Sequence, residues 1–193
     1  KFEHLGSVIP DWKAGFGTTF RYKNLSLSAQ FTAQVGGVAY SVTNFALSYQ
    51  GKLKNSLAGR DDGLVLQGVN AVDNGDGTVS YQNPAVTENI YTYYQSYKWV
   101  RDNGRENTFS TDFLKFKELR IDYQLPKHLM AKTRFLQGAS IGFFATNLFC
   151  ITDWPQFDPE AAGLVNGTNI YPGIETVTFP MTRTYGINIK LQF

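Results

Sequence analysis

The sequence lacks most of the residue patterns that carry catalysis or metal binding. Its 193 residues contain a single cysteine, Cys150, and two histidines, which excludes a disulfide framework, a four-cysteine metal site and a thiol pair. It also has no H-E-x-x-H motif, no glycine-rich phosphate loop and no credible catalytic triad. We therefore expect no catalytic residues, no metal ligands and no cofactor, and we predict that the protein is not an enzyme.

Long apolar runs and charge of one sign are equally scarce. The longest apolar segments are of the kind found at 141–145, which excludes a transmembrane helix of about 20 residues. Charged residues make up 18% of the chain and the formal net charge is +2, too little to indicate a nucleic-acid partner. Residues 1–14 show no basic region followed by an apolar one, so any export signal is expected outside this sequence.

Aromatic residues and glycines are plentiful, which favours a β-rich chain. Aromatics make up 15% of the residues, and there are 18 glycines. The segment 184–193 alternates with a period of two, since Tyr185, Ile187, Ile189, Leu191 and Phe193 share one side while polar or small residues share the other. This alternation predicts a strand with one apolar and one polar face.

Four earlier segments show the same signal. Strands are expected over 16–22, 25–35, 112–126 and, with two partly apolar faces, 139–149. A tight turn is expected at 23–24. If the strands alternate in direction, both long irregular regions, 36–112 and 150–180, lie at the same end of the strands. Short turns on one side and long loops on the other are typical of outer-membrane barrels, whose strands need only about 9–11 residues.

The sequence therefore predicts an all-β fold, a transmembrane antiparallel β-barrel segment with long extracellular loops. Five strands cannot close a barrel, so we expect the chain to be part of a larger one. Two alternatives remain open at this point: a secreted β-sandwich that binds glycans, and a segment of a passive porin.

Several motifs also resemble a known family, in matching order and spacing. They lie in 6–40, in 112–126 (D-F-L-K-F-K-E-L-R-I-D-Y-Q-L-P), in 147–149 (N-L-F), in 158–160 (D-P-E) and in 179–193. Together they resemble the C-terminal part of the SusC/RagA family of TonB-dependent outer-membrane transporters from the Bacteroidetes. The chain departs from the family pattern at Asp112, Phe116 and Asp122, where Ser, Leu and Gly are common.

The resemblance implies the last five strands of a 22-stranded, multi-pass barrel in a Gram-negative outer membrane. Residues 1–193 would be the C-terminal portion, without the plug domain and the N-terminal strands. The expected function is nutrient uptake, the import of oligosaccharides or oligopeptides. The expected partners are the rest of the barrel with its plug, a SusD-like surface lipoprotein that acts as a lid, the TonB complex and outer-membrane lipid.

Three groups of residues are candidate sites. The apolar side of the last strand looks like the signal read by barrel-assembly machinery, and it is also explained by lipid contact; its members are Tyr185, Ile187, Ile189, Leu191 and Phe193. Aromatic loop residues could stack on cargo or pack the loop on itself, and they are Tyr91, Tyr93, Tyr94, Tyr97, Trp99 and Trp154. Lumen-facing residues could pair with the plug or line the route, and they are Arg21, Arg120, Asp122, Asn188 and Lys190.

Three smaller features complete the expectations. Lys115 and Lys117 fall on the outward side of the alternation near the outer rim, where lipopolysaccharide phosphates or solvent would meet them. Residues 73–78 (D-N-G-D-G-T) lack the distal Glu of a calcium loop and predict a turn between two valines. Residues 158–160 predict loop geometry because of Pro159.

Overall fold

The computed structural model describes residues 3–65, 70–82, 86–87, 91, 103–130, 135–161 and 172–193. The chain divides into two compact units, one of residues 1–40 and 109–193 and the other of residues 41–108. No helix within the described ranges has the length and apolar character to cross a membrane.

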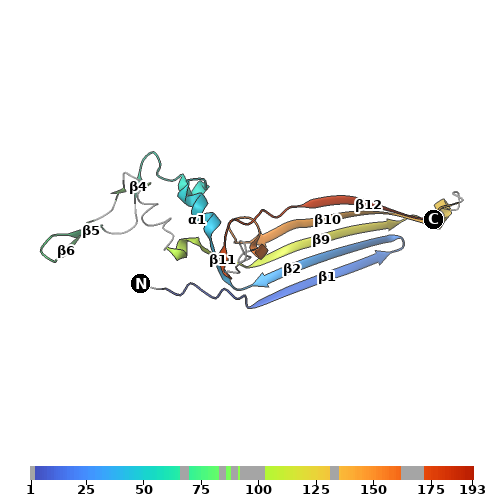
Figure 1. The fold of residues 1–193 in the computed structure, drawn as a ribbon, viewed down its shortest axis with the longest axis horizontal. Helices are drawn as coiled ribbons and strands as arrows, with labels where there is room; N and C mark the ends of the chain where they lie inside the picture. The colour runs from blue at the N-terminus through green and yellow to red at the C-terminus, as the bar shows by residue number, and fades with distance from the viewer. Residues whose placement is uncertain are drawn as a thin grey trace. The chain divides into compact units, whose positions relative to one another are not determined.

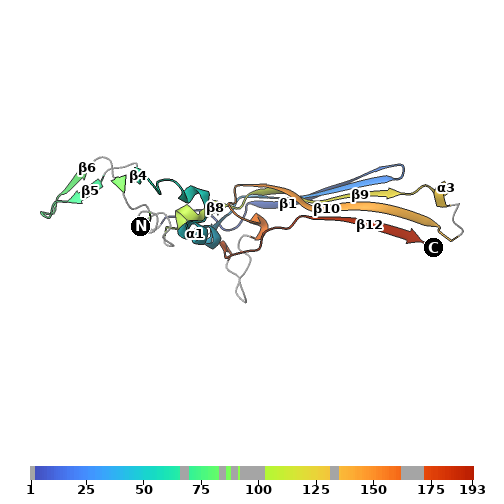
Figure 2. The same cartoon turned by 90° about the horizontal axis from the view of Figure 1, so that it is seen from above.

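A five-stranded antiparallel sheet dominates the first unit (Figures 1 and 2). Its strands, in spatial order, are β1 (Trp12–Tyr22), β2 (Leu25–Val35), β9 (Phe113–Gln124), β10 (Gly138–Thr152) and β12 (Thr184–Gln192). Each pairs with its neighbour in antiparallel register. Both edge strands, β1 and β12, have a single partner among the described residues, so the sheet is open.

The strand predictions are confirmed, with shifts at the ends. The strand at 25–35 has the predicted bounds, and the turn at 23–24 is present, with Tyr22 paired to Leu25. Lys23 takes the positive φ of 51° in that turn. The fourth strand runs on to Thr152 instead of ending near Phe149. Within the long region 36–112, which was expected to be irregular, residues 38–49 form a short strand followed by a helix.

Shorter elements complete the first unit. A three-stranded sheet has the order β11 (Ile174–Glu175), β3 (Val38–Ser41), β8 (Thr108–Ser110). A single turn of helix, α3 (Lys127–Met130), follows β9, and the 3-10 turn η4 (Pro159–Ala161) follows β10. Gly36, with φ of +81°, ends β2, and the Asp112 carboxylate accepts a hydrogen bond from its backbone N–H at 2.6 Å.

The second unit is built from short elements. Helix α1 (Val42–Tyr49) begins at Ser41, whose hydroxyl accepts the Asn44 N–H at 3.0 Å as an N-cap. The 3-10 turns are η1 (Lys54–Ser56) and η3 (Gly104–Asn107), and the strand pairs are β4 (Leu64–Val65) with β7 (Val86–Thr87) and β5 (Asn70–Asp73) with β6 (Val79–Gln82). The last pair confirms the turn predicted at 73–78.

Candidate functional site

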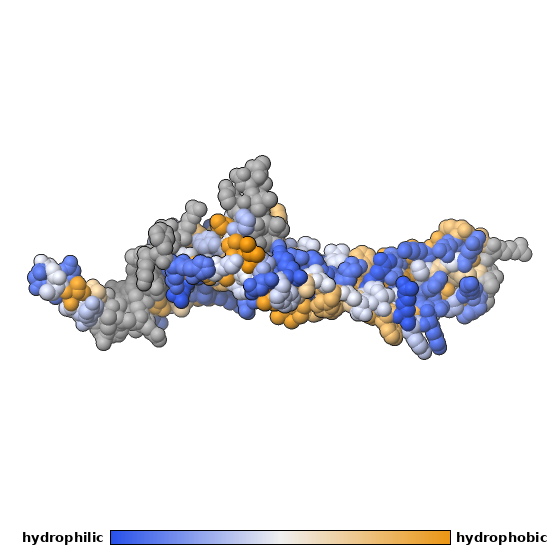
Figure 3. All heavy atoms as spheres, turned by 90° about the horizontal axis from the view of Figure 1, so that it is seen from below, coloured by the Kyte–Doolittle hydropathy of each residue, from blue (hydrophilic) through white to orange (hydrophobic). Residues whose placement is uncertain are grey.

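One face of the five-stranded sheet, the apolar face, carries apolar side chains on every strand. The register aligns Leu27 with Ile121, and Ile121 with Phe143, which in turn opposes Ile187. Much of this face is uncovered, since Phe20 on β1 is 63% exposed and Ile187 on β12 is 70% exposed. Figure 3 shows apolar residues gathered in a band along the strands, with polar residues beside it. A contiguous apolar surface of this extent indicates contact with a membrane or a partner.

An aromatic row crosses the apolar face from strand to strand. Phe16 on β1 stacks on Phe31 of β2 with ring centroids 4.9 Å apart, and Phe31 stacks on Phe116 of β9 at 4.4 Å. Phe116 meets Phe149 of β10 edge to face at 5.5 Å. We call these four residues the aromatic row. Each offset or edge contact is favourable beyond simple area burial, so the row joins four strands at one level.

The opposite face, the polar face, holds all five residues that were predicted to face the lumen. Ser28 of β2 opposes Arg120, and Ser26 opposes both Arg21 and Asp122. Asp122 and Asn188 flank Gly142 from its two neighbouring strands, because a Cβ at Gly142 would collide with the side-chain oxygens of both. The register thus places the five lumen candidates on one face of the sheet.

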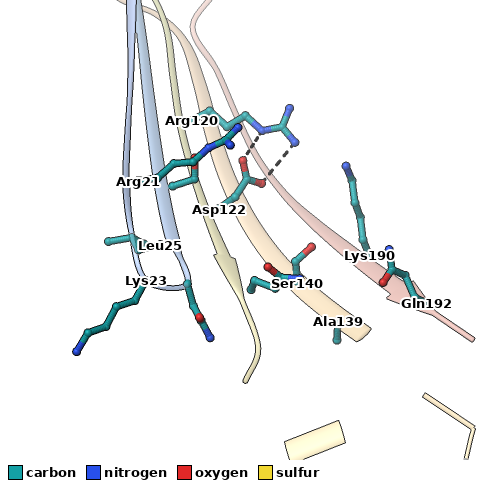
Figure 4. A pocket seen from close by; sticks show the side chains of 12 residues that line it. Arg21, Lys23, Leu25, Arg120, Asp122, Ala139, Ser140, Lys190 and Gln192 are labelled. Carbon is teal, nitrogen blue, oxygen red and sulfur yellow. Dashed lines mark hydrogen bonds and ion pairs between the residues drawn. The ribbon is translucent and has the colours of Figure 1, made fainter. Parts of the chain in front are cut away.

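A hollow of about 370 Å³ lies on the polar face, at the end of the sheet with the 23–24 turn. We call it the cationic hollow, because four cationic side chains and one acidic side chain line it: Arg21, Lys23, Arg120, Lys190 and Asp122. Arg120 donates from Nε to Asp122 Oδ2 at 2.6 Å, and Figure 4 shows both over the same part of the sheet as Arg21. One acid is thereby matched to one cation, which leaves the hollow with an excess of positive charge.

A buried ion-pair cluster lies on the polar face away from the hollow. Lys115 of β9 is 0% exposed, and its Nζ donates to Asp158 Oδ1 at 2.6 Å and to Glu160 Oε2 at 2.7 Å. Lys117 reaches the same Glu160 oxygen at 2.7 Å. Burial opposes the charge of Glu160, but the hydrogen bonds from both lysines outweigh it and hold the pKa of that carboxyl below its ordinary value.

The outward placement predicted for Lys115 is wrong. In the register between β2 and β9, Phe31 opposes Phe116 while Gln30 opposes Glu118, so Lys117 is an extra residue in β9. Such a β-bulge shifts the alternation by one. Lys115 therefore lies on the same face as Glu118 and Arg120, and not on the face of Leu119. Lys117, at the bulge, is half-exposed and paired with Glu160.

The D-P-E motif acquires a structural role through this cluster. Asp158 Oδ1 also accepts the backbone N–H of Glu160 at 3.0 Å, and Pro159 is fully buried between the two acids. The sequence singled out the motif but missed its partner, which is 43 residues earlier in the chain. The available signal was a lysine between Leu114 and Phe116 in a strand.

The aromatic ligand candidates receive little support from the described residues. Tyr91 is exposed, whereas Tyr93, Tyr94, Tyr97 and Trp99 lie outside the described residues. Trp154 is only 5% exposed and meets Phe109 edge to face, with ring centroids 6.1 Å apart. Its position is that of a residue packing the start of the loop, the alternative that the sequence left open.

The candidates on the last strand all project from the apolar side of the sheet edge. Ile189 is 67% exposed and opposes Ile141, while Phe193 stacks on Phe135 with centroids 6.3 Å apart. In the β5–β6 turn, Asp73 accepts the Gly75 N–H and Asp76 the Thr78 N–H. Among the described residues, no group of three or more His, Cys, Asp or Glu side chains could hold a metal.

Two curated relatives match nearly the whole chain, and both are TonB-dependent receptors. TonB-dependent receptor P3 of Formosa agariphila is 29% identical over 195 residues, and TonB-dependent receptor P39 of the same organism is 23% identical over 200 residues. The resemblance to TonB-dependent receptors is confirmed. Each match covers 98% of this chain but 17% of the relative, so the chain spans about a sixth of the relatives' length. No family model matches.

Solved structures show the same fold. The RagAB peptide importer in its open-open state matches with a TM-score of 0.59 at 22% identity, covering 97% of this chain and 18% of that one. The RagAB peptide transporter matches with a TM-score of 0.60 at 20% identity, covering 98% and 18%. These TonB-dependent receptor and RagAB matches agree with the SusC/RagA resemblance found in the sequence.

Proposed function

We propose that the chain is the C-terminal portion of a TonB-dependent importer in a Gram-negative outer membrane, and that its sheet is part of a 22-stranded barrel wall. The observation that carries this is the division of one open sheet into an uncovered apolar face and a charged opposite face. In hydrocarbon every backbone polar group must be paired, so a sheet can span a membrane only when neighbours complete both edges. Strands β1 and β2, each of 11 residues, have the required length.

The two faces then have defined surroundings. The apolar face meets lipid, and the aromatic row adds contact area there. The polar face lines the interior, where Arg21, Arg120, Asp122, Asn188 and Lys190 pair with the plug or border the cargo route. The long segments 36–112 and 153–183 are the extracellular loops. We infer a role in transport and not in catalysis, in line with relatives that are named as a receptor and a peptide transporter.

We infer the partners and the cargo from the resemblance to the same family. We infer a SusD-like surface lipoprotein that closes over the barrel, energy transfer through TonB to a plug outside these residues, and cargo that is an oligosaccharide or an oligopeptide. The RagAB structures are named as a peptide importer and transporter, which supports the peptide option. The aromatic run from Tyr91 to Trp99 is the proposed cargo contact among the loops, whereas Trp154 is buried against Phe109.

The last strand is proposed to carry the assembly signal as well as the lipid contact. Tyr185, Ile187, Ile189, Leu191 and Phe193 would be read as one apolar stripe during insertion. Deleting Phe193 from the full-length protein is expected to lower the amount of folded barrel in the outer membrane, measured by heat-modifiable migration on gels. Unchanged insertion would remove the signal role and leave the lipid contact.

Accessibility of the apolar face tests the proposal as a whole. Nitroxide labels at positions 31 and 187 of the full-length protein in lipid bilayers should relax with oxygen and not with a water-soluble nickel complex. Labels at 28 and 188, on the polar face, are the matched controls and should show the reverse preference or respond to neither reagent. Labels at 31 and 187 that respond to neither reagent would indicate a packed opposing sheet, as in a β-sandwich.

A further inference from the structure

We propose that Lys115 is a positioning residue: with Asp158 and Glu160 it forms a charge clamp that fixes residues 153–160, the loop base, to the polar face of the sheet. The proposed transport function assigns no role to these three residues. The clamp sets where the segment 153–183 leaves the sheet. All three of its residues belong to the first unit.

Burial makes the pairing obligatory. A lysine ammonium that is removed from water is tolerated only when charged partners and hydrogen bonds replace its hydration. Lys115 Nζ has both, from Asp158 at 2.6 Å and from Glu160 at 2.7 Å, and it lies 5.5 Å from the centroid of the Phe113 ring. If the loop base left the sheet, the ammonium would lose both carboxylates at once. The loop base is therefore held by the cost of leaving this charge unpaired.

The β-bulge at Lys117 determines the face of the sheet on which Lys115 lies. With regular alternation Lys115 and Lys117 would share one face and Arg120 would lie on the other. The extra residue instead places Lys115 on the polar face, opposite Thr32 of β2 and Cys150 of β10. It also lets Lys117 reach Glu160 Oε2 at 2.7 Å. Bulges are a known means of redirecting a side chain, and here the redirected side chain is the buried cation.

Two further contacts seat the start of the loop base. Thr152 Oγ1 donates to the Asp112 carbonyl at 2.6 Å and accepts the Trp154 N–H at 3.1 Å. Trp154 is buried and packs against Phe109. The loop base is thus fixed at its beginning by Thr152 and Trp154 and at its end by the clamp. One consequence rests on the proposed function: the clamp sets the point from which the cargo-facing part of the loop extends.

Hydrogen exchange of the full-length protein tests the clamp directly. In the Lys115→Met variant, which keeps the length of the side chain and removes its charge, the amides of 153–160 should exchange about tenfold faster or more. Amides of β2 should be unchanged. Lys13→Met, which changes an exposed lysine on the polar face of β1, is the matched control and should leave the loop base unaffected.

Combining variants separates a clamp from general destabilisation. Asp158→Asn with Glu160→Gln should itself accelerate exchange of the loop base, and adding Lys115→Met should add little, because the same interaction has already been lost. Unchanged exchange in Lys115→Met, or fully additive effects, would overturn the proposal. If Lys115→Met does not fold, Glu160→Gln keeps one carboxylate on Lys115 and should give a smaller acceleration in the same amides; no acceleration would also overturn it. Hydrogen exchange of the loop base and lipid accessibility of the apolar face are independent measurements, so the clamp and the proposed function can fail separately.

Discussion

Phe31 of β2 and Phe116 of β9 stack with nearly parallel rings, 7° between planes and 4.4 Å between centroids, on the uncovered face of the sheet. The contact lies directly beside the bulge, since Phe116 immediately precedes Lys117. The same local irregularity therefore places an aromatic ring on the apolar face and, one residue earlier, a charged ammonium on the polar face. The aromatic row on one face and the ion-pair cluster on the other depend on one register.

Truncating Phe116 should destabilise the protein more than truncating an exposed aromatic residue outside the sheet. We expect Phe116→Ala to lower the free energy of unfolding of the full-length protein by about 1–3 kcal/mol, because it removes apolar contact area and two ring contacts from the middle of the aromatic row. Denaturant unfolding in bilayers measures the change. Phe179→Ala is the control, since Phe179 is 92% exposed, and it should stay within about 0.5 kcal/mol. Equal effects would show that the row contributes nothing specific.

A side chain at Gly142 should disturb the polar face. A Cβ there would collide with the side chains of Asp122 and Asn188, so Gly142→Ala is expected to cost about 1–3 kcal/mol of stability through overpacking. Gly15→Ala on β1 is a matched control, because its nearest atom would be the Phe31 carbonyl oxygen at 3.9 Å. Denaturant midpoints compare the two variants, and a Gly142→Ala protein as stable as the control would contradict the packing described.

The period-two alternation was enough to predict the strands and most of the faces. It works because successive side chains of a strand point to opposite sides, and it identified 25–35 with its observed bounds. It predicted β10 as a strand but left the orientation of its two faces open for a physical reason: Phe144 lies on the polar face, with its ring over Gly186 where no side chain competes. Because β10 carries apolar residues on both sides, its alternation does not show which side belongs to the apolar face of the sheet.

The clamp could not be predicted in the same way. A single extra residue at Lys117 reverses the face of everything before it, and nothing in the local sequence marks that position as a bulge. The partners of Lys115 are also separated from it by 43 and 45 residues. Tertiary register, and not local pattern, brings these three charges together.

The loop base should loosen in acid. The pKa of Glu160 is held below its ordinary value of 4.5 by Lys115 and Lys117, against the opposing effect of burial. A carboxyl whose folded pKa is depressed contributes stability that is present above its unfolded pKa and is lost as pH falls through the folded pKa. Exchange in 153–160, corrected for intrinsic rate, should be constant from pH 7 to about 5 and rise below 4.5.

A neutral side chain at position 160 provides the control for that profile. Glu160→Gln should begin with faster exchange at pH 7 and show a smaller rise on acidification, because one titrating partner is missing. A wild-type profile that stays flat to pH 3 would show that ionisation of Glu160 does not contribute to holding the loop base.

The positive excess of the cationic hollow predicts a carboxylate from the rest of the protein. Within the described residues Lys190 has no ion pair, and the one acid lining the hollow, Asp122, is bonded to Arg120. If the polar face lines a filled interior, an acidic segment outside residues 1–193 should approach Lys190. A zero-length carbodiimide cross-linker joins an amine to a carboxylate only when the two are in contact. Mass spectrometry of the cross-linked full-length protein should then find a peptide containing Lys190 joined to such a segment.

Lys190→Arg is the matched control for this experiment, because it keeps the charge and the contact but removes the reactive amine. The variant should fold and insert like the wild type and lose that one cross-linked peptide. Cross-links from Lys190 to Asp122 or Glu118 alone, or none at all, would mean that no outside carboxylate enters the hollow. The positive excess would then face water, and the polar face at this level would border an open passage instead of a packed interior.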